Sequence, residues 1–406
     1  MKLTKLLSLI LCLILCLPLA GAWAEAAEDN AVQVPALKIV RREIPENEAM
    51  EFLKKMGVGW NLGNTFDATK GDWNRNADEM TVETSWLPDK ARTTEAMFAA
   101  LKAAGFSAVR IPVSWHDHVD ENVQISQKWL NRVQEVVDWA LGQDLFVILN
   151  IHHDEDQFLP TPEHYEESAR YVGSIWSQLA ERFRDYDDRL IFESMNEPRV
   201  LGASYEWNYD AAIPDCVAAA KCVNQLNQLF VDTVRASGGH NADRYLMVPG
   251  YDAAPAGALS DVFTLPRDTA DNRIIVSVHA YTPYDFALNT KGGKTFGAQS
   301  QKMEIVSFMN SLYSRYIAAG IPVVIGEYGA LTKGDDHLQD RVDWTAFYVA
   351  TASARNIPCI WWDNGSFSGS GENFGLMNRR NAQFVYGEIL DAIITYGGWD
   401  KLPEAQ

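Results

Sequence analysis

LFVILNI at residues 145–151 and LIFESM at residues 190–195 are the two apolar runs from which the fold can be worked out. Runs of this kind, rich in Val, Ile and Leu, are typical of strands that are buried on both faces. Between them, Ile175, Leu179 and Phe183 recur at the spacing of one face of a helix. Strand, helix and strand in this order predict two parallel strands joined by a crossover helix.

The same alternation runs through most of the chain. Eight runs are candidate strands, at residues 57–62, 108–113, 145–151, 190–195, 245–250, 274–279, 322–326 and 358–362. Helical stripes separate them, among them Trp129, Val133, Val136, Val137 and Ala140, and also Leu226, Leu229, Phe230 and Val234. Eight buried strands that alternate with helices predict an α/β fold of one domain, a (β/α)8 TIM barrel over residues 46–406.

The first 24 residues have the pattern of an export signal. Lys2 and Lys5 precede an apolar run at residues 6–17, and AWA at residues 22–24 follows as a small-residue cleavage motif. The apolar run is short for a membrane span. We therefore predict a signal peptide at residues 1–24 that is removed on secretion to the periplasm or the extracellular space, with no membrane attachment afterwards.

Cys16 leaves one alternative, a lipid-anchored N-terminus. That modification normally follows a small residue, and here Leu15 stands before the cysteine. Residues 25–45 lack periodicity and contain two Pro. We expect them to form an N-terminal tail that packs loosely or not at all.

The 406-residue chain is strongly acidic, with a formal net charge of −19. This charge argues against nucleic acid or an anionic membrane as partner and favours a neutral substrate, although solubility alone would also explain it. We expect a monomer. Beyond the predicted leader lie Cys216, Cys222 and Cys359, of which Cys359 falls in an apolar run. Cys216 and Cys222 can pair only if Cys216 lies in the loop before the helix, because on one helix their spacing is too long to bridge.

Polar side chains follow the strand candidates at the ends where the next loops begin. They are Asn61, Arg110, His152, His153, Asn196, Glu197, His279, Tyr281, Glu327 and Trp362 with Asp363. The carboxyl ends of parallel strands meet at one face of a barrel, where active sites are built. Because charged groups are costly inside a core, polar residues at nearly every strand end predict a site.

Glu197 and Glu327 are carboxylates on two different strands. Such a pair suits cleavage of a glycosidic bond, because one carboxyl must protonate the leaving oxygen while the other attacks the anomeric carbon. Carboxyls about 5–5.5 Å apart would retain the configuration through a covalent intermediate. Arg110 could hold one of them ionised through a charge-assisted hydrogen bond.

Two other kinds of function remain open. His152, His153 and Asp154 could hold a metal ion, but adjacent residues of a strand point to opposite faces and rarely share one. We predict no metal and no cofactor, since two carboxyls supply all the proton and nucleophile chemistry that a glycosidase needs. A barrel that binds glycans without cutting them would have lost a carboxylate, and both are present here.

Seven motifs, taken together, resemble those of glycoside hydrolase family five. They are GWNLGN at residues 59–64, RIPVSW at 110–115, NIHH at 150–153, FESMNEP at 192–198, VHAY at 278–281, IGEYG at 325–329 and WDNG at 362–365. The match extends from about residue 48 to residue 399. GWNLGNT at residues 59–65 and the segment at residues 224–239 look like subfamily four.

The resemblance implies a role for each polar residue. Glu197 matches the acid/base, Glu327 the nucleophile, and Asn196 the residue that bonds the 2-hydroxyl of the attacked sugar. The other positions match residues that support the nucleophile or bind the substrate: Asn61, Arg110, His152, His153, His279, Tyr281 and Trp362, the last as the aromatic platform under that sugar.

The resemblance further implies a secreted retaining endo-β-1,4-glucanase that cuts cellulose-type glucan by double displacement. Subfamily four also includes enzymes that prefer xyloglucan, mixed-linkage β-glucan or xylan, and the residues leave that choice open. Tryptophans suited to sugar stacking fall at strand ends or in the loops after them, at Trp60, Trp73, Trp86, Trp115, Trp207 and Trp362. Trp86 and Trp207 are candidates for flanking subsites, whereas Trp129 and Trp139 are expected in the core.

Overall fold

The computed structural model describes residues 31–71 and 76–402. The chain divides into a unit of residues Met1–Gln33 and a unit of residues Val34–Gln406, and the fold is that of the second. The predicted signal peptide at residues 1–24 and the loop residue Trp73 lie outside the described residues. Within the described part of the chain, every helix is too short or too polar to cross a lipid bilayer.

Eight parallel strands close into a barrel in sequence order, with β1 paired to β8. The strands are β1 Val58–Leu62, β2 Ala108–Ile111, β3 Phe146–Asn150, β4 Leu190–Glu193, β5 Leu246–Pro249, β6 Ile274–His279, β7 Val323–Tyr328 and β8 Cys359–Asp363. Each overlaps a predicted run, although β7 and β8 continue beyond the predicted ends at residues 326 and 362, and the predicted TIM barrel is confirmed. A short antiparallel pair, β9 Met377–Asn378 and β10 Gln383–Phe384, follows β8.

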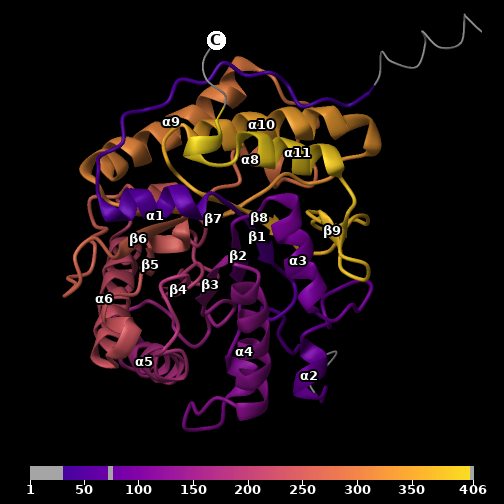
Figure 1. The fold of residues 1–406 in the computed structure, drawn as a ribbon. Helices are drawn as coiled ribbons and strands as arrows, with labels where there is room; N and C mark the ends of the chain where they lie inside the picture. The colour runs from indigo at the N-terminus through magenta and orange to yellow at the C-terminus, as the bar shows by residue number, and fades with distance from the viewer. Residues whose placement is uncertain (1–30, 72–75, 403–406) are drawn as a thin grey trace, which may run out of the picture. The chain divides into compact units, whose positions relative to one another are not determined.

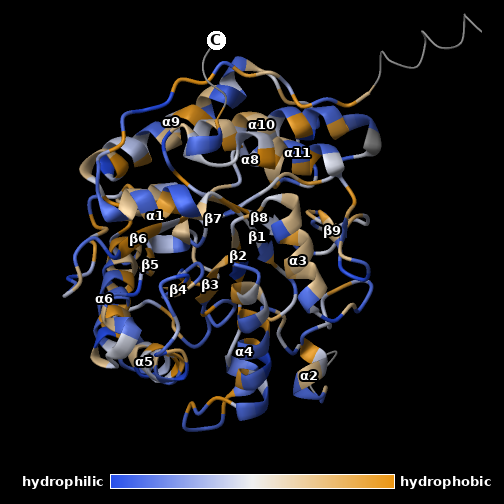
Figure 2. Ribbon diagram, in the orientation of Figure 1, coloured by the Kyte–Doolittle hydropathy of each residue, from blue (hydrophilic) through white to orange (hydrophobic). Residues whose placement is uncertain are grey.

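Helices lie around the barrel strands (Figure 1). They are α1 Glu48–Met56, α2 Glu79–Val82, α3 Glu95–Ala104, α4 Gln127–Gly142, α5 Tyr165–Arg182, α6 Pro214–Ala236, α7 Pro255–Ala258, α8 Tyr284–Ala287, α9 Gln299–Arg315, α10 Leu338–Ser353 and α11 Gly387–Tyr396. Short 3-10 helices include η1 His116–His118, η2 Gly239–Ala242 and η3 Tyr251–Ala253. Hydrophobic and hydrophilic segments alternate along α9 (Figure 2), as expected of a helix with one face on a core.

The predicted stripe on α4 packs into the core, with one exception. Trp129 and Val133 are fully buried. Trp139, which was also expected in the core, is only partly buried, and the guanidinium carbon of Arg132 lies 5.0 Å from its ring centroid. The interpretation of Trp139 was wrong because a helix on a barrel buries only one face, and Trp139 falls at the margin of that face.

Residues 34–45 are held against the barrel domain, so the expectation of a loose tail was wrong for this part. The N–H of Leu37 donates to the hydroxyl of Tyr396 at 3.1 Å. The N–H of Arg42 donates to the carbonyl of Ala354 at 2.8 Å, and Ile39 is buried. These partners are distant from residues 34–45 in the sequence, so the local periodicity of this segment could not indicate them.

Cys216 and Cys222 both lie on α6, and Cys216 is inside the helix. Their thiols are free and buried, as is that of Cys359 on β8. The condition for a disulfide, with Cys216 in the loop before the helix, is therefore not met.

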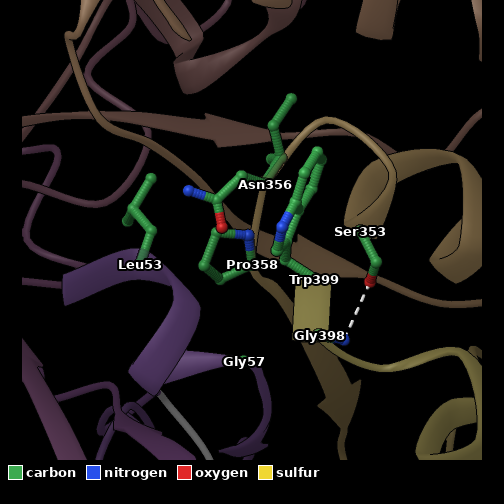
Figure 3. Close-up of a pocket in the computed structure, with 8 residues that line it drawn as sticks. Leu53, Gly57, Ser353, Asn356, Pro358, Gly398 and Trp399 are labelled. Atoms are coloured by element: carbon green, nitrogen blue, oxygen red, sulfur yellow. Dashed lines mark hydrogen bonds between the residues drawn. The ribbon is translucent and has the colours of Figure 1, made fainter. Parts of the chain in front are cut away.

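The amino-terminal end of the barrel is closed where the two ends of the domain meet. Figure 3 shows a recess there, lined by Leu53 of α1, by Pro358 just before β8 and by Trp399 near the C-terminus. The N–H of Gly398 donates to Oγ of Ser353 at 3.0 Å in the same place. This recess lies at the opposite end of the strands from the polar residues, and the amino-terminal face of such a barrel serves stability.

Candidate active site

Glu197, His279 and Glu327 come together at the carboxyl ends of β4, β6 and β7. One oxygen of each carboxylate and one ring nitrogen of His279 lie within 4.8 Å of one another. The side chain of Glu327 is 6% exposed and that of Glu197 is 18% exposed, so water reaches the carboxyl of Glu197 more easily.

Irregular strand pairing positions two of these side chains. The pairing of β6 with β7 shifts between Val278 and His279, and that of β7 with β8 shifts between Ile325 and Tyr328. Such a shift changes the direction in which the neighbouring side chains point. Gly326 leaves the space that His279 occupies, because a Cβ at this position would lie 3.1 Å from Nε2 of the imidazole.

Glu327 accepts a hydrogen bond on each carboxylate oxygen. Nη1 of Arg110 donates to Oε1 at 2.6 Å, and the hydroxyl of Tyr281 donates to Oε2 at 2.9 Å. Burial and the charge of Glu327 raise the pKa of Tyr281 well above its usual value, so this hydroxyl keeps its proton. Together the two donors hold the carboxylate in a fixed position.

Arg110 is fully buried, and all three of its guanidinium nitrogens donate. Nε bonds Glu193 at 2.7 Å, Nη1 bonds Asn61 at 3.1 Å as well as Glu327, and Nη2 bonds Asn196 at 2.8 Å. Burial lowers the pKa of Arg110, but the charges of Glu193 and Glu327 outweigh burial and raise the pKa above its ordinary value. The guanidinium is therefore a permanent cation that orients its partners.

Asn61 lies in the barrel wall and does not face the cleft. Its side chain is 0% exposed. Nδ2 donates to the carbonyls of Gly326 and Ile360 at 2.9 and 3.1 Å, and Oδ1 accepts from Arg110. The sequence analysis placed Asn61 among the substrate-binding residues, and the structure corrects this, because both polar atoms are used inside the wall. Its role is to orient Arg110 through this hydrogen bond.

Glu193 is the site residue to which the sequence analysis gave no role. It lies on β4 and is 0% exposed. Oε2 accepts from Arg110 and from Asn150 at 2.7 and 3.0 Å, and Oε1 accepts from the hydroxyl of Ser277 at 2.7 Å. The signal was present in the sequence, because Glu193 is the one charged residue in the run LIFESM and a buried charge requires a partner.

Glu197 and His279 form a coupled pair in which Nδ1 of His279 lies 2.9 Å from Oε1 of Glu197. Burial raises the pKa of Glu197, but the hydrogen bond and charge of His279, with the charge of Arg199, outweigh burial and lower the pKa below its ordinary value. Burial lowers the pKa of His279, but the charge of Glu327 and the bond to Glu197 raise it. In the unliganded site the proton of the pair therefore lies on His279.

A second arginine, Arg199, lies on the other side of Glu197. Its Nη1 donates to Oε1 of Glu155 at 2.8 Å and lies 3.8 Å from Oε2 of Glu197. Its guanidinium carbon lies 4.0 Å from the ring centroid of Trp207, which is exposed. The sequence analysis did not single out Arg199 and Glu155, because they come from loops without a motif of their own.

Trp362 and His152 form one wall of the site. Their rings are nearly parallel, with centroids 5.8 Å apart and an interplanar angle of 4°. Gly63 makes room for the indole, since a Cβ there would lie 2.9 Å from two of its carbons. Burial keeps the pKa of His152 well below its usual value, so this imidazole stays neutral. Nδ2 of Asn196 makes no hydrogen bond in the described part of the chain and remains available to a ligand.

His153 lies next to His152 and reaches the surface, with 34% of its side chain exposed. Nδ1 lies 3.6 Å from Oε1 of Glu155. Burial lowers the pKa of His153, but its contact with Glu155 outweighs burial and raises it. The ring also lies beside Trp86, with centroids 5.6 Å apart, so Trp86 borders the same side of the site.

One potential ligand atom each of Asp67, His152 and His153 lies within 4.8 Å of the others. Their hydrogen bonds do not suit a metal ion. Nδ2 of Asn150 and Nδ1 of His152 are 3.2 Å apart, and because an amide nitrogen can only donate, the ring proton of neutral His152 lies on Nε2. Both oxygens of Asp67 accept backbone N–H groups from the turn that begins at Asn64.

Trp60 and Trp115 belong to the barrel wall and not to a subsite. Both are fully buried. Nε1 of Trp60 donates to Asp363 at 2.8 Å, and Nε1 of Trp115 donates to the carbonyl of Asn150 at 3.0 Å. Among the described tryptophans named for sugar stacking, this leaves Trp86, Trp207 and Trp362.

The chain matches the family model "Cellulase (glycosyl hydrolase family 5)" over residues 70–368. It belongs to this family. Endoglucanase 1 of Ruminococcus albus is 40% identical to this cellulase-family chain over 354 residues, which cover 87% of the chain and 82% of the relative. Endoglucanase B of the same organism is 38% identical over 379 residues, with 93% and 88% covered. The family predicted from the motifs is confirmed.

Solved structures of the cellulase family have the same fold. A family 5 lichenase from Caldicellulosiruptor sp. F32, a mutant in complex with cellotetraose, gives a TM-score of 0.87 at 47% identity, covering 90% of this chain and 100% of that one. A subfamily-four broad specificity endoglucanase from Ruminococcus champanellensis with bound cellotriose gives 0.80 at 43% identity, covering 87% and 100%.

Proposed function

We propose that this chain is a retaining endo-β-1,4-glucanase with Glu327 as nucleophile and Glu197 as acid/base. As a cellulase-family enzyme it is an endoglucanase. The observation that carries the assignment is the closeness of the two carboxylates, with one oxygen of each within 4.8 Å of the other. Inverting enzymes need a wider gap, about 6.5–9.5 Å, to hold a water between the carboxyls.

In the first step, an oxygen of Glu327 attacks the anomeric carbon. The glycosidic C–O bond breaks, its electron pair stays on the leaving oxygen, and Glu197 protonates that oxygen. In the second step, water attacks the same carbon from the side that the leaving group vacated, Glu197 takes the proton of the water, and Glu327 is released. Arg110 and Tyr281 position the attacking carboxylate throughout, through their bonds of 2.6 and 2.9 Å.

The proton for the first step comes from the Glu197–His279 pair. His279 lies 3.8 Å from Oε1 of Glu327, whose negative charge favours the protonated imidazole. As Glu327 forms its bond to carbon it loses that charge, and the proton moves along the 2.9 Å contact to Glu197. After donation, Glu197 is ionised beside a neutral imidazole, which suits the base of the second step.

The substrate is a β-glucan backbone. Trp362 beside His152 offers an apolar face for a sugar ring, and the exposed Trp207 and the partly buried Trp86 add aromatic surface next to it. A surface that continues beyond the cleavage point suits internal cuts in a polymer. We place cellulose-type glucan first, and the 47% identity to a family 5 lichenase makes mixed-linkage glucan the second candidate.

Secretion and the monomeric state belong to the same proposal. The basic, apolar and small-residue pattern of residues 1–24 supports export, with the mature chain acting on extracellular or periplasmic polysaccharide. N-terminal sequencing of the mature protein tests the cleavage site. Light scattering tests the monomer.

The experiment is reducing-end release by purified residues 25–406 on carboxymethylcellulose, mixed-linkage β-glucan, xyloglucan, xylan and glucomannan, with Glu327→Gln as the blank. Activity that the variant lacks supports the assignment, and the order of the polymers identifies the substrate. A wild-type chain that is inactive on all five contradicts it. Proton NMR of the first-formed anomer tests retention separately.

A further inference from the structure

Arg199 is a charged residue beside Glu197 to which the proposed reaction gives no task. It lies in the loop that follows β4, and it is 8% exposed. A guanidinium that loses most of its contact with water needs partners that compensate it. Its contacts therefore indicate what this side chain holds in place.

Carboxylates of three residues lie around the guanidinium of Arg199. Nη1 donates to Oε1 of Glu155 at 2.8 Å, and Nε donates to Oε1 of Glu206 at 3.4 Å. Nη1 also donates to the backbone carbonyl of Glu197 at 3.0 Å and lies 3.8 Å from its Oε2. Because the donors of a guanidinium form a rigid planar fork, bonds at two of its nitrogens fix the orientation of the whole group.

The guanidinium lies against the indole of Trp207. Its central carbon is 4.0 Å from the ring centroid, within the range of a cation–π contact. A group at this distance covers one face of the ring, and because Trp207 is still 55% exposed, the other face is open. An aromatic ring that is supported from behind and open in front suits stacking on the apolar face of a sugar.

Glu206 fastens the loop that carries Trp207. One of its carboxylate oxygens accepts from Nε of Arg199, and the other accepts the N–H of Gly202 at 2.9 Å. Gly202 has a φ angle of 73°, which allows the chain to turn there. The place of the indole relative to Glu197 is therefore set by contacts that pass through Arg199.

Trp207 lies on the side of Glu197 that faces away from the proposed nucleophile. Nδ1 of His279 is 2.9 Å from Oε1 of Glu197 and 3.8 Å from Oε1 of Glu327, so Oε1 is on the side of the nucleophile. Oε2 of Glu197 is on the side of Arg199, and the indole lies against the guanidinium. Because the acid protonates the leaving oxygen, a sugar on this indole belongs to the leaving part of the substrate.

We propose that Arg199 is a positioning residue for the leaving part of the β-glucan. It holds the open face of Trp207 at a set distance from Glu197, so that a glucosyl unit stacked there presents its glycosidic oxygen to the acid. The inference rests on the proposed function, in which Glu197 protonates that oxygen with the proton that it receives from His279.

Arg199→Lys tests the proposal, because lysine keeps a positive charge beside Glu197 but has no planar group to support the indole. The first measurement is the share of cuts at each bond of cellopentaose labelled with heavy oxygen at its reducing end. In the variant, cuts should shift toward the reducing end, because such cuts place fewer sugars on the leaving side. On the polymer, kcat/KM should fall by about tenfold. On β-cellobiosyl fluoride, whose leaving group is a single atom, kcat/KM should stay near the wild-type value.

Trp207→Ala and the double variant show whether Arg199 acts through the indole. Because Trp207 is exposed, its loss should leave the fold intact. If Arg199 works by supporting the ring, the double variant should be no slower on the polymer than Trp207→Ala alone, since residues in contact are not additive.

Arg273→Lys is the matched control. Its guanidinium carbon lies 4.6 Å from the ring centroid of Tyr245, and both residues come directly before strands, at the opposite end of the barrel from Glu197. This variant loses a similar stacked guanidinium and should leave the bond pattern on cellopentaose and both values of kcat/KM unchanged.

An unchanged bond pattern in Arg199→Lys, or a shift of cuts toward the non-reducing end, would overturn the proposal. So would an equal loss on the polymer and the fluoride, or additive losses in the double variant. If thermal unfolding shows that Arg199→Lys does not fold, Glu206→Ala, which removes the partner of Nε, should give the same shift of cuts. Failure of the proposed function differs, because the wild-type chain would then cleave neither cellopentaose nor the fluoride, or Glu327→Gln would remain active on them.

Discussion

Arg110 donates Nη1 to Oε1 of Glu327 at 2.6 Å, and the side chains are 0% and 6% exposed. The same guanidinium bonds the buried Glu193 at 2.7 Å. One cation therefore sets the position of Glu327, the proposed nucleophile, and compensates a second carboxylate inside the barrel. Charge-assisted bonds of this kind give geometric specificity as well as energy.

Arg110→Lys should therefore harm both stability and activity. A single ammonium cannot reach Glu193, Glu327 and Asn196 together, which leaves a buried carboxylate without its partner. We expect a loss of about 3–5 kcal/mol in the free energy of unfolding and a fall in kcat of at least about a hundredfold. Arg189→Lys is the control, because its ion pairs are exposed at the surface and it should cost under about 1 kcal/mol. Near-wild-type kcat in Arg110→Lys would contradict this account of the nucleophile.

Glu327→Gln should abolish turnover on every substrate while leaving oligosaccharide binding largely intact, because the amide keeps the shape but cannot attack carbon. We expect kcat to fall by at least about a thousandfold. Calorimetric titration with cellotetraose measures binding alongside the kinetics. Activity of a tenth or more of the wild type would remove Glu327 from the role of nucleophile.

Glu197→Ala should lose least on substrates with good leaving groups. The polymer needs a proton on its leaving oxygen, so its kcat should fall by about 10²–10⁴-fold. An aryl β-cellobioside with a stable phenolate needs little acid help, and its first step should be nearly spared. The comparison requires kcat and pre-steady-state bursts on both substrates. Equal losses on the two would count against Glu197 as the acid.

His118 should make the fold less stable as the pH falls. Its ring stacks on Trp129 with centroids 3.7 Å apart, and burial, followed by the charge of Lys70, lowers its pKa from 6.5 to about 3. The unfolded chain therefore binds the proton first, and stability present above about pH 6.5 is lost below it, by at most about 1.4 kcal/mol per pH unit. The carboxylate of Glu79, 3.8 Å from Nδ1, is too distant for a hydrogen bond.

His118→Phe keeps the stack and removes the proton site. Chemical unfolding at pH 7 and pH 5 should show a smaller difference in the free energy of unfolding for this variant than for the wild type. His240→Phe, at an exposed position, should leave that difference unchanged. An undiminished difference in His118→Phe would show that other groups cause the acid sensitivity.

Much of the fold was predictable because a buried parallel strand has a composition of its own. LFVILNI at residues 145–151 needs no knowledge of its neighbours to be recognised, and the eight runs placed the residues at their ends on one face. Glu197 and Glu327 could be paired for the same reason, since parallel strands end together. The helical spacing of α4 likewise indicated Trp129 as core, although it could not separate Trp129 from Trp139 at the margin.

Other features depend on contacts between residues that are distant in the sequence. The sequence suggested that Asn61 binds a ligand, but in the structure its amide donates to carbonyls of β7 and β8. Glu193 had no predicted role, and the structure shows that it accepts a hydrogen bond from Arg110.

The sequence by itself determined the barrel, the family and the two carboxylates, because residues that become buried in strands and helices follow a local pattern along the chain. The tertiary structure decided which polar residues face the cleft and which stay in the barrel wall. It thereby also decided which of these groups carry a proton. A charge or hydrogen bond acts over only a few ångströms, and those distances exist only once the barrel has closed.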